Sequence, residues 1–190
     1  MSVIVCDFDE TLFPTLAKVI EIYNKRYDDT LSLNTITTYN LYESLPAQVA
    51  DRLLELFMNK EVYDDLQPYK GSVKAIQTLV NNGCEVYVAT ATSVKNLEWK
   101  EQLLQRYFPF MPKENLIRIH NKKLLNCDIL IEDNLDNLVG TFADRLCFNQ
   151  PWNQNESADY AYDIHRFSSW GEVVNIINKI EKENEEWEKE

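Results

Sequence analysis

Two pairs of acidic residues stand directly after short apolar runs of the sequence. Asp7 and Asp9 follow the first run, and Glu132 and Asp133 follow a later one. If both runs are parallel strands of one sheet, these carboxylates meet at the edge where open α/β sheets bind ligands. Two like charges about 4 Å apart repel by about 4 kcal/mol at an effective dielectric constant of roughly 20, so the cluster needs a cation. Oxygen donors without His or Cys suit Mg²⁺.

Hydroxyl groups and a lysine are expected at the same edge of the sheet. Thr90 and Thr92 follow the second apolar run, and the third run leads into Lys122. A single acid at a strand end is more often a helix cap or a turn former. Four carboxylates, a hydroxyl-rich turn and a lysine at one edge are a much less ordinary combination, and they mark the candidate site.

The composition excludes several classes of protein. The chain has 190 residues, of which 45% are hydrophobic and 26% charged, as is typical of one globular domain. Its formal net charge of −12 repels nucleic acids and anionic membranes, so neither a long nucleic acid nor a membrane is expected as a partner. No apolar run approaches the roughly 20 residues of a membrane span. Four widely spaced cysteines without a CxxC pair are expected as reduced thiols in the cytoplasm.

Strand and helix patterns alternate along most of the chain. Helical periodicity separates the apolar runs, which are typical of strands buried on both faces. This alternation predicts a doubly wound, Rossmann-like α/β fold with a parallel sheet. The expected strands are 2–6, 84–89, 116–119, 127–131 and 145–148, and the expected helices are 72–81, 94–107 and 170 to about 182.

One segment interrupts the alternation, because residues 15–65 are too long for a loop between the first strand and the next helix. Helical patterns at 16–26 and 48–58 predict a small helical cap inserted there. The α/β core is then expected to comprise residues 1–14 and 66–190. Residues 183–190 form an acidic tail that is expected to fray.

In these motifs the sequence resembles the haloacid dehalogenase superfamily of phosphotransferases. The string DFDETL at residues 7–12 fits its DxDx(T/V) motif, and the remaining three motifs follow in order at Thr90, Lys122 and the pair Glu132 and Asp133. Within the superfamily the sequence looks like the 5'(3')-deoxyribonucleotidase family. The marks of that family are DLQP at 65–68, VYVATAT at 86–92, YFPF at 107–110 and NKKLLNCDILIEDN at 121–134.

The resemblance implies a role for each motif residue in the hydrolysis of deoxynucleoside 5'-monophosphates. Asp7 would attack phosphorus and form an aspartyl-phosphate, while Asp9 would act as general acid and then general base. Thr90 would hydrogen-bond a phosphoryl oxygen and Lys122 would balance its charge, with Lys123 as the competing lysine.

The resemblance also implies a metal site and a nucleotide-binding cap. Mg²⁺ would be held by the Asp7 carboxylate, the Asp9 backbone carbonyl and Asp133, with Glu132 orienting a metal-bound water. Aromatic cap residues enclose the base in the resembled family, and Thr92 lies at the same edge of the site. The aromatic candidates here are Phe13, Tyr39, Phe57 and Tyr63, each of which also fits a purely structural place in the cap core.

Two departures from the family pattern affect the expected base contacts. Glu10 stands where glycine is common, and the family aromatic beyond the first motif is replaced around Thr15, with Phe13 displaced by two positions. Trp152, in a turn after Pro151, is expected to pack against helices and to have no link to the chemistry.

Other functions fit parts of this pattern. A phosphatase of the same superfamily could act on a sugar phosphate or another small metabolite, because specificity rests on few cap contacts. A receiver-type phosphoacceptor module uses similar residues, but there the acidic pair lies on the first strand and the acceptor on the third. A silent ligand-binding relative would not need the complete set of motif residues. The sequence leaves base preference, sugar type, phosphate position and a homodimer open.

Overall fold

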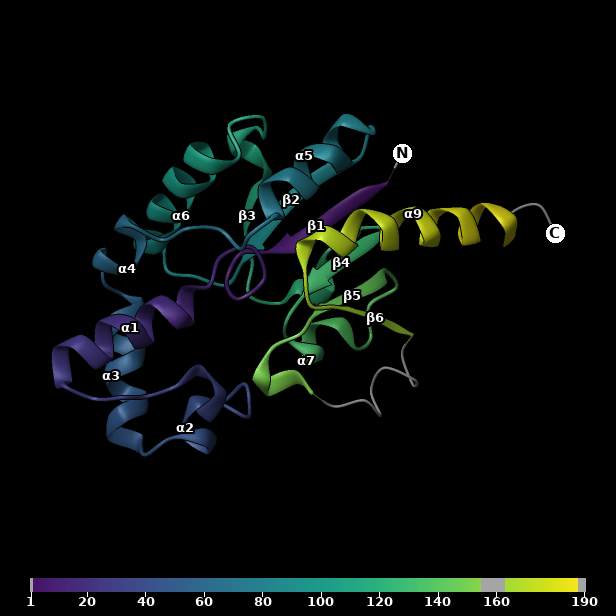
Figure 1. Ribbon diagram of the computed structural model, residues 1–190. Helices are drawn as coiled ribbons and strands as arrows, with labels where there is room; N and C mark the ends of the chain where they lie inside the picture. Colours follow the sequence, from purple (N-terminus) through teal and green to yellow (C-terminus); the bar gives the residue numbers. More distant parts are fainter. Residues whose placement is uncertain (1, 155–162, 188–190) are drawn as a thin grey trace.

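Six parallel strands form a single sheet in the part of the chain that the structure describes (Figure 1). The structure is a computed structural model and describes residues 2–154 and 163–187. The strands lie in the order β3-β2-β1-β4-β5-β6, which places the two acid-bearing strands β1 and β4 side by side. This confirms the predicted fold. The strands are β1 Val3–Asp7, β2 Glu85–Thr90, β3 Leu116–Arg118, β4 Ile129–Glu132, β5 Asp144–Phe148 and β6 Ile164–Phe167.

Side chains of the central strands alternate between two hydrophobic clusters on opposite faces of the sheet. On β1, Cys6 contributes to one cluster and Val5 to the other. Helices α5 (Ser72–Asn81) and α9 (Trp170–Trp187) pack together over the first cluster, and α7 (Leu135–Leu138) packs on β4 and β5 (Figure 1). Because both faces are covered, the central strands are nearly continuous apolar runs and can be recognised in the sequence.

Four helices lie between β1 and α5, and residues 15–65 are called the helical insertion below. They lie beyond the carboxyl end of β1 (Figure 1), where the expected ligand edge is. The two longer helices match the predicted ones to within one residue at each end, and they pack against each other. The four helices are α1 Thr15–Tyr27, α2 Leu41–Ser44, α3 Ala47–Phe57 and α4 Glu61–Asp64.

Helix α6 (Val94–Tyr107) has the predicted bounds. It begins after Ser93, whose hydroxyl accepts a hydrogen bond from the Asn96 backbone N–H over 3.2 Å. Its buried face carries two polar residues, Asn96 and Lys100, among apolar ones. Lysine is almost never fully buried unless it is paired, so this face of α6 does more than fill the core.

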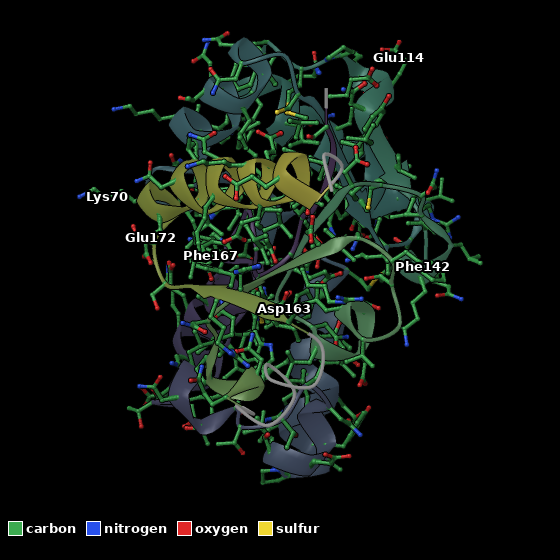
Figure 2. The ribbon with its side chains drawn as sticks, turned by 90° about the vertical axis from the view of Figure 1, so that its right-hand side faces the viewer. Lys70, Glu114, Phe142, Asp163, Phe167 and Glu172 are labelled. Carbon is green, nitrogen blue, oxygen red and sulfur yellow. The ribbon has the colours of Figure 1, made fainter. Side chains whose placement is uncertain are left out.

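Strand β6 is not predicted from the sequence, because His165 and Arg166 interrupt its apolar pattern. It forms an edge of the sheet and pairs in parallel with β5. Phe167, labelled in Figure 2, anchors it. Its buried ring lies 5.6 Å from the ring of Trp170 at the start of α9.

Helix α9 extends to Trp187, past the expected end near residue 182. Lys179 and Glu183 form an ion pair of 3.5 Å one turn apart, so part of the acidic tail continues the helix. Residues 188–190 of the tail lie outside the described residues.

No helix among those described is both long and apolar enough to cross a membrane. The short 3-10 helices are Leu33–Thr35, Lys113–Asn115, Lys122–Leu124 and Pro151–Asn153.

Candidate active site

A cavity of about 530 Å³ lies where the carboxyl ends of the strands face the helical insertion. The sheet side contributes Asp7, Asp9, Lys122 and Asp133, so four of the predicted site residues come together as expected. The insertion side is largely apolar and aromatic. It contributes, among others, Leu16, Ile36, Tyr39, Leu54, Phe57 and Tyr63.

Asp7 is the last residue of β1, and its carboxylate is almost completely buried. Asp7 Oδ1 lies 2.6 Å from Lys122 Nζ and accepts a hydrogen bond from the Phe8 backbone N–H over 2.7 Å. Burial, and then the charge of Glu132, raise the pKa of Asp7 to about 7. An ionised Asp7 carboxylate therefore depends on cations around it.

Glu132 holds Lys122 in place and does not reach the cavity. Its Oε1 accepts from Lys122 Nζ and from Asn137 Nδ2, the latter over 2.8 Å. Its Oε2 accepts from the backbone N–H groups of Asp133 and Asn134 over 3.2 and 3.1 Å. Both oxygens are thus occupied by protein donors. This arrangement disagrees with the expectation that Glu132 orients a metal-bound water, and it assigns Glu132 to positioning the lysine.

Lys122, the lysine of the third motif, is buried between the two carboxylates of Asp7 and Glu132. Burial alone would lower the pKa of Lys122, but the charges of Asp7 and Glu132 raise it above its usual value. The competing Lys123 is exposed. The structure therefore places Lys122 rather than Lys123 beside Asp7.

Asp133 is fixed by residues from two other parts of the chain. Trp152 Nε1 donates to Asp133 Oδ2 over 2.9 Å, and Thr11 Oγ1 donates to Asp133 Oδ1 over 3.3 Å. Burial, and then the charges of Glu132 and Asp7, raise the pKa of Asp133. Trp152 also lines the cavity. The expectation that Trp152 only packs against helices is wrong, because its indole N–H orients a carboxylate of the site.

Asp9 is anchored at both carboxylate oxygens. Thr15 Oγ1 donates to Asp9 Oδ1 over 2.8 Å, and Lys100 Nζ pairs with Asp9 Oδ2. The same Lys100 Nζ donates to Thr90 Oγ1 over 2.8 Å and lies 4.7 Å from the centre of the Phe8 ring. Lys100 belongs to none of the motifs described above. Its signal is a lysine on the buried face of an amphipathic helix, in register with Asn96 and Leu103.

The two predicted threonines occupy different positions. Thr90, the last residue of β2, is fully buried, and its hydroxyl touches the site only through Lys100. Thr92 lines the cavity together with Ala91 and Ser93. The turn after β2 thus contributes to the cavity wall.

Three of the four predicted aromatic residues line the cavity, and the fourth does not. Tyr39, Phe57 and Tyr63 face it from the helical insertion. Phe13 is fully buried and stacks on Phe8 with 4.4 Å between ring centres, so its assignment to the substrate is wrong. The cause is the tight turn after β1, in which the backbone N–H of Glu10 donates to the carbonyl of Phe13 and folds that ring into the core.

Glu10 has a structural task that a glycine could not perform. Its backbone has a φ of 56°, a left-handed conformation that favours glycine. Its side chain accepts a hydrogen bond from the Leu16 backbone N–H in the first turn of α1, where the capping residue Pro14 offers no side-chain acceptor. Burial raises the pKa of Glu10 to about 8. Glu10 therefore connects the turn after β1 to the helical insertion.

The donor set fits a hard divalent cation. Carboxylate oxygens of Asp7, Glu132 and Asp133 lie within 4.8 Å of one another in a buried cluster without His or Cys. Burial, together with the charges of the neighbouring carboxylates, raises the pKa of both Asp7 and Asp133 although Lys122 is present, so a bound cation would stabilise their ionised forms. Each Glu132 oxygen accepts two protein donors, which fills its lone pairs, whereas each Asp133 oxygen accepts one, and the partners of Asp7 lie on Oδ1. Asp7 and Asp133 are therefore the residues that fit Mg²⁺.

The fold and the site together define a hydrolase of the haloacid dehalogenase type. Two solved structures share the fold. A HAD family hydrolase from Deinococcus radiodurans, solved with bound phosphate and sodium, has a TM-score of 0.63 at 14% identity and covers 94% of this chain and 96% of its own. A haloacid dehalogenase-like protein from Agrobacterium tumefaciens has a TM-score of 0.65 at 13% identity, with 95% and 99% covered.

Sequence comparison narrows this class to one family. The model of the family described as "5' nucleotidase, deoxy (Pyrimidine), cytosolic type C protein" matches residues 1–183, and the chain belongs to this family. The 5'(3')-deoxyribonucleotidase of Bacillus subtilis is 28% identical over 177 residues, which cover 90% of this chain and 96% of the relative. The enzyme of the same name from Clostridium acetobutylicum is 27% identical over 153 residues, covering 80% and 83%. The chain is therefore a phosphomonoesterase of the 5'-nucleotidase type.

Proposed function

We propose that this phosphomonoesterase hydrolyses deoxynucleoside 5'-monophosphates in a Mg²⁺-dependent reaction through an aspartyl-phosphate on Asp7. The observation that carries the proposal is the cavity itself. Its sheet side holds the nucleophile, the acid and Lys122, and its insertion side offers an apolar, aromatic wall of nucleoside size. The names of the relatives support the same substrate class.

In the first step, a carboxylate oxygen of Asp7 forms a bond to phosphorus while the bond from phosphorus to the sugar oxygen breaks. Asp9 gives its proton to that leaving oxygen. In the second step, water attacks the aspartyl-phosphate, Asp9 takes a proton from the water, and the bond between phosphorus and Asp7 breaks to release phosphate. Thr15 and Lys100 hold both oxygens of Asp9, so the carboxylate is oriented for both transfers.

Lys122 and Thr90 would act on the phosphoryl oxygens. Lys122 Nζ lies 2.6 Å from Asp7 Oδ1, so its positive charge is beside the phosphorus that Asp7 attacks. Thr90 is fully buried outside the cavity lining, so it would act through Lys100, which donates to its hydroxyl over 2.8 Å and lines the cavity. Mg²⁺ held by Asp7, Asp133 and the Asp9 carbonyl would neutralise charge on the nucleophile and the phosphate.

The helical insertion would bind the nucleoside. Tyr39, Phe57 and Tyr63 line that wall, and Thr92 lines the cavity from the turn after β2. Aromatic walls bury a base with little loss of conformational entropy and exclude water from the reacting centre.

The four cysteines are free thiols, which supports a reducing compartment such as the cytoplasm.

The test is phosphate release from deoxy- and ribonucleoside monophosphates, with sugar phosphates included, in Mg²⁺ or in EDTA. Turnover of deoxynucleotides that EDTA and Asp7→Asn both abolish is the expected result. Asp28→Asn is the matched control, since Asp28 is exposed and does not line the cavity. Preference for a sugar phosphate would overturn the substrate assignment, and turnover by Asp7→Asn would overturn the covalent intermediate.

A further inference from the structure

Asn96 lies where the catalytic side of the cavity meets the helical insertion. It is on the buried face of α6, one turn before Lys100, and it lines the cavity. Its Nδ2 donates to the Phe57 backbone carbonyl over 2.8 Å and to the Tyr63 hydroxyl over 3.1 Å. Asn96 therefore connects the α/β core to the insertion through one amide nitrogen.

The amide oxygen of Asn96 has no hydrogen-bond partner among the described residues. Asn96 is 3% exposed, and its Oδ1 is the one side-chain atom in the described part of the chain that is buried in this way. A buried polar atom without a partner is unfavourable, and such groups are rare in folded proteins. Here the atom belongs to a residue of the cavity wall, so a ligand is the natural source of the missing donor.

The orientation of the amide follows from its partners. The Phe57 carbonyl can only accept a hydrogen bond, so the nitrogen of Asn96 must face it. The Tyr63 hydroxyl donates to that same carbonyl over 3.0 Å and thus accepts from Asn96. Exchanging nitrogen and oxygen would break the bond to Phe57. The unpartnered atom is therefore an acceptor, and it requires a donor.

The position of Asn96 selects the sugar as the source of that donor. A helix rises about 1.5 Å per residue, so Asn96 lies about 6 Å along α6 from Lys100, which pairs with Asp9. Asn96, its partner Tyr63 and Asp9 all line the same cavity. In the proposed reaction the pentose is the part of the substrate next to the leaving oxygen, so a cavity residue one helical turn from Lys100 is placed to reach the sugar rather than the base.

We propose that Asn96 Oδ1 accepts a hydrogen bond from the 3'-hydroxyl of the substrate deoxyribose and thereby determines sugar specificity. The proposal rests on the proposed function, because a deoxynucleoside 5'-monophosphate brings one free sugar hydroxyl to this place. A site with a buried acceptor discriminates strongly against an analogue that lacks the donor, since the acceptor then stays unpaired. Asn96 would select for the 3'-hydroxyl without taking part in proton transfer.

The experiment compares two substrates that differ only in that hydroxyl, a 2'-deoxynucleoside 5'-monophosphate and its 2',3'-dideoxy counterpart. For the unmodified enzyme we expect kcat/KM to fall about tenfold on loss of the hydroxyl. For Asn96→Leu we expect both substrates to react at the same reduced rate, within about twofold. This comparison of two enzymes with two substrates separates the hydrogen bond from a general structural effect. A general effect would lower kcat/KM for both substrates by the same factor and leave the ratio of the two values unchanged.

Tyr63→Phe is the matched control. It removes the hydroxyl that accepts a hydrogen bond from Asn96 Nδ2 but leaves Asn96 Oδ1 in place. The tenfold difference in kcat/KM between the two substrates should therefore persist, whatever the variant does to the overall rate. Asn96→Ala replaces Asn96→Leu if the latter does not fold, as judged by its thermal unfolding.

Three results would overturn the assignment. They are a tenfold difference in kcat/KM that persists in Asn96→Leu, equal kcat/KM values for the two substrates in the unmodified enzyme, and a kcat/KM that falls on methylation of a base N–H instead of on loss of the sugar hydroxyl. In each case deoxynucleotides are still hydrolysed, so the proposed function stands. If the enzyme hydrolyses sugar phosphates and no nucleotide, the proposed function itself fails.

Discussion

Lys100 Nζ donates a hydrogen bond to Thr90 Oγ1 over 2.8 Å while pairing with Asp9. One buried cation from α6 therefore connects the residue at the end of β2 to the second acid of the turn after β1. The hydroxyl proton of Thr90 remains free, because the hydroxyl acts as acceptor toward Lys100. Lys100 thus positions Asp9, the general acid of the proposed mechanism, and the Thr90 hydroxyl at once.

Lys100→Met should lower kcat by about 10- to 100-fold, with a smaller change in KM, because Asp9 and Thr90 lose their common donor. Steady-state kinetics with a deoxynucleoside monophosphate checks this. Lys95→Met is the matched control, since Lys95 is an exposed lysine on the same helix that lies 5.3 Å from the Trp99 ring. An equal effect of both substitutions would show that α6 tolerates no methionine and that Lys100 has no special task.

The motif residues of the sheet could be predicted because strand ends fix where their side chains lie. Asp7 and Asp133 each follow a buried apolar strand, and the adjacent positions of β1 and β4 bring them together. Lys100 and Trp152 could not be predicted in the same way. Lys100 reaches Asp9 across 91 positions and Trp152 reaches Asp133 across 19, and such contacts exist only after packing.

The two errors at aromatic residues also have physical causes. Phe13 is close in sequence to the catalytic acids, but a backbone hydrogen bond in the turn folds it toward Phe8 and away from the cavity. Trp152 resembles a packing residue, because nothing in the sequence around it indicates which group accepts a hydrogen bond from its indole N–H. Strand β6 could not be predicted because, at the edge of the sheet, the partly buried His165 and Arg166 interrupt its apolar pattern.

Trp152→Phe should weaken Mg²⁺ affinity by about 10- to 100-fold, because Asp133 Oδ2 loses the indole donor that orients it. The measurement is activity as a function of Mg²⁺ concentration, with KM for the nucleotide recorded separately. Trp99→Phe is the control, since Trp99 packs on the Tyr63 ring at 5.3 Å between centres. Unchanged Mg²⁺ dependence in Trp152→Phe would contradict an orienting role.

The stability of the metal-free protein should fall as the pH rises from 5 to 8. Burial raises the pKa of Glu10 from 4.5 to about 8, so across this window the unfolded chain releases a proton that the folded chain keeps. This contribution to stability is fully present at pH values below the pKa of Glu10 in the unfolded chain. It is lost as the pH rises toward the pKa of Glu10 in the folded chain. Asp7, with its pKa raised to about 7, acts in the same direction.

Glu10→Gln should flatten this decline, because glutamine keeps an oxygen for the Leu16 N–H but has no proton to release. The effect is on the order of a few kcal/mol at pH 8. Urea unfolding in EDTA at several pH values measures it, with the exposed Glu114→Gln (Figure 2) as control. A decline that is as steep in Glu10→Gln as in the unmodified protein would exclude Glu10 as its source.

Two aromatic truncations should separate the core from the substrate wall. Phe13→Ala should destabilise the fold by about 3–5 kcal/mol, because Phe13 is fully buried against Phe8. Tyr39→Ala should leave stability nearly unchanged, because Tyr39 is 63% exposed, yet it should raise KM several-fold with kcat less affected. Thermal unfolding and steady-state kinetics on both variants check this division. If Tyr39→Ala unfolds as easily as Phe13→Ala and binds nucleotide normally, Tyr39 supports the insertion rather than the substrate.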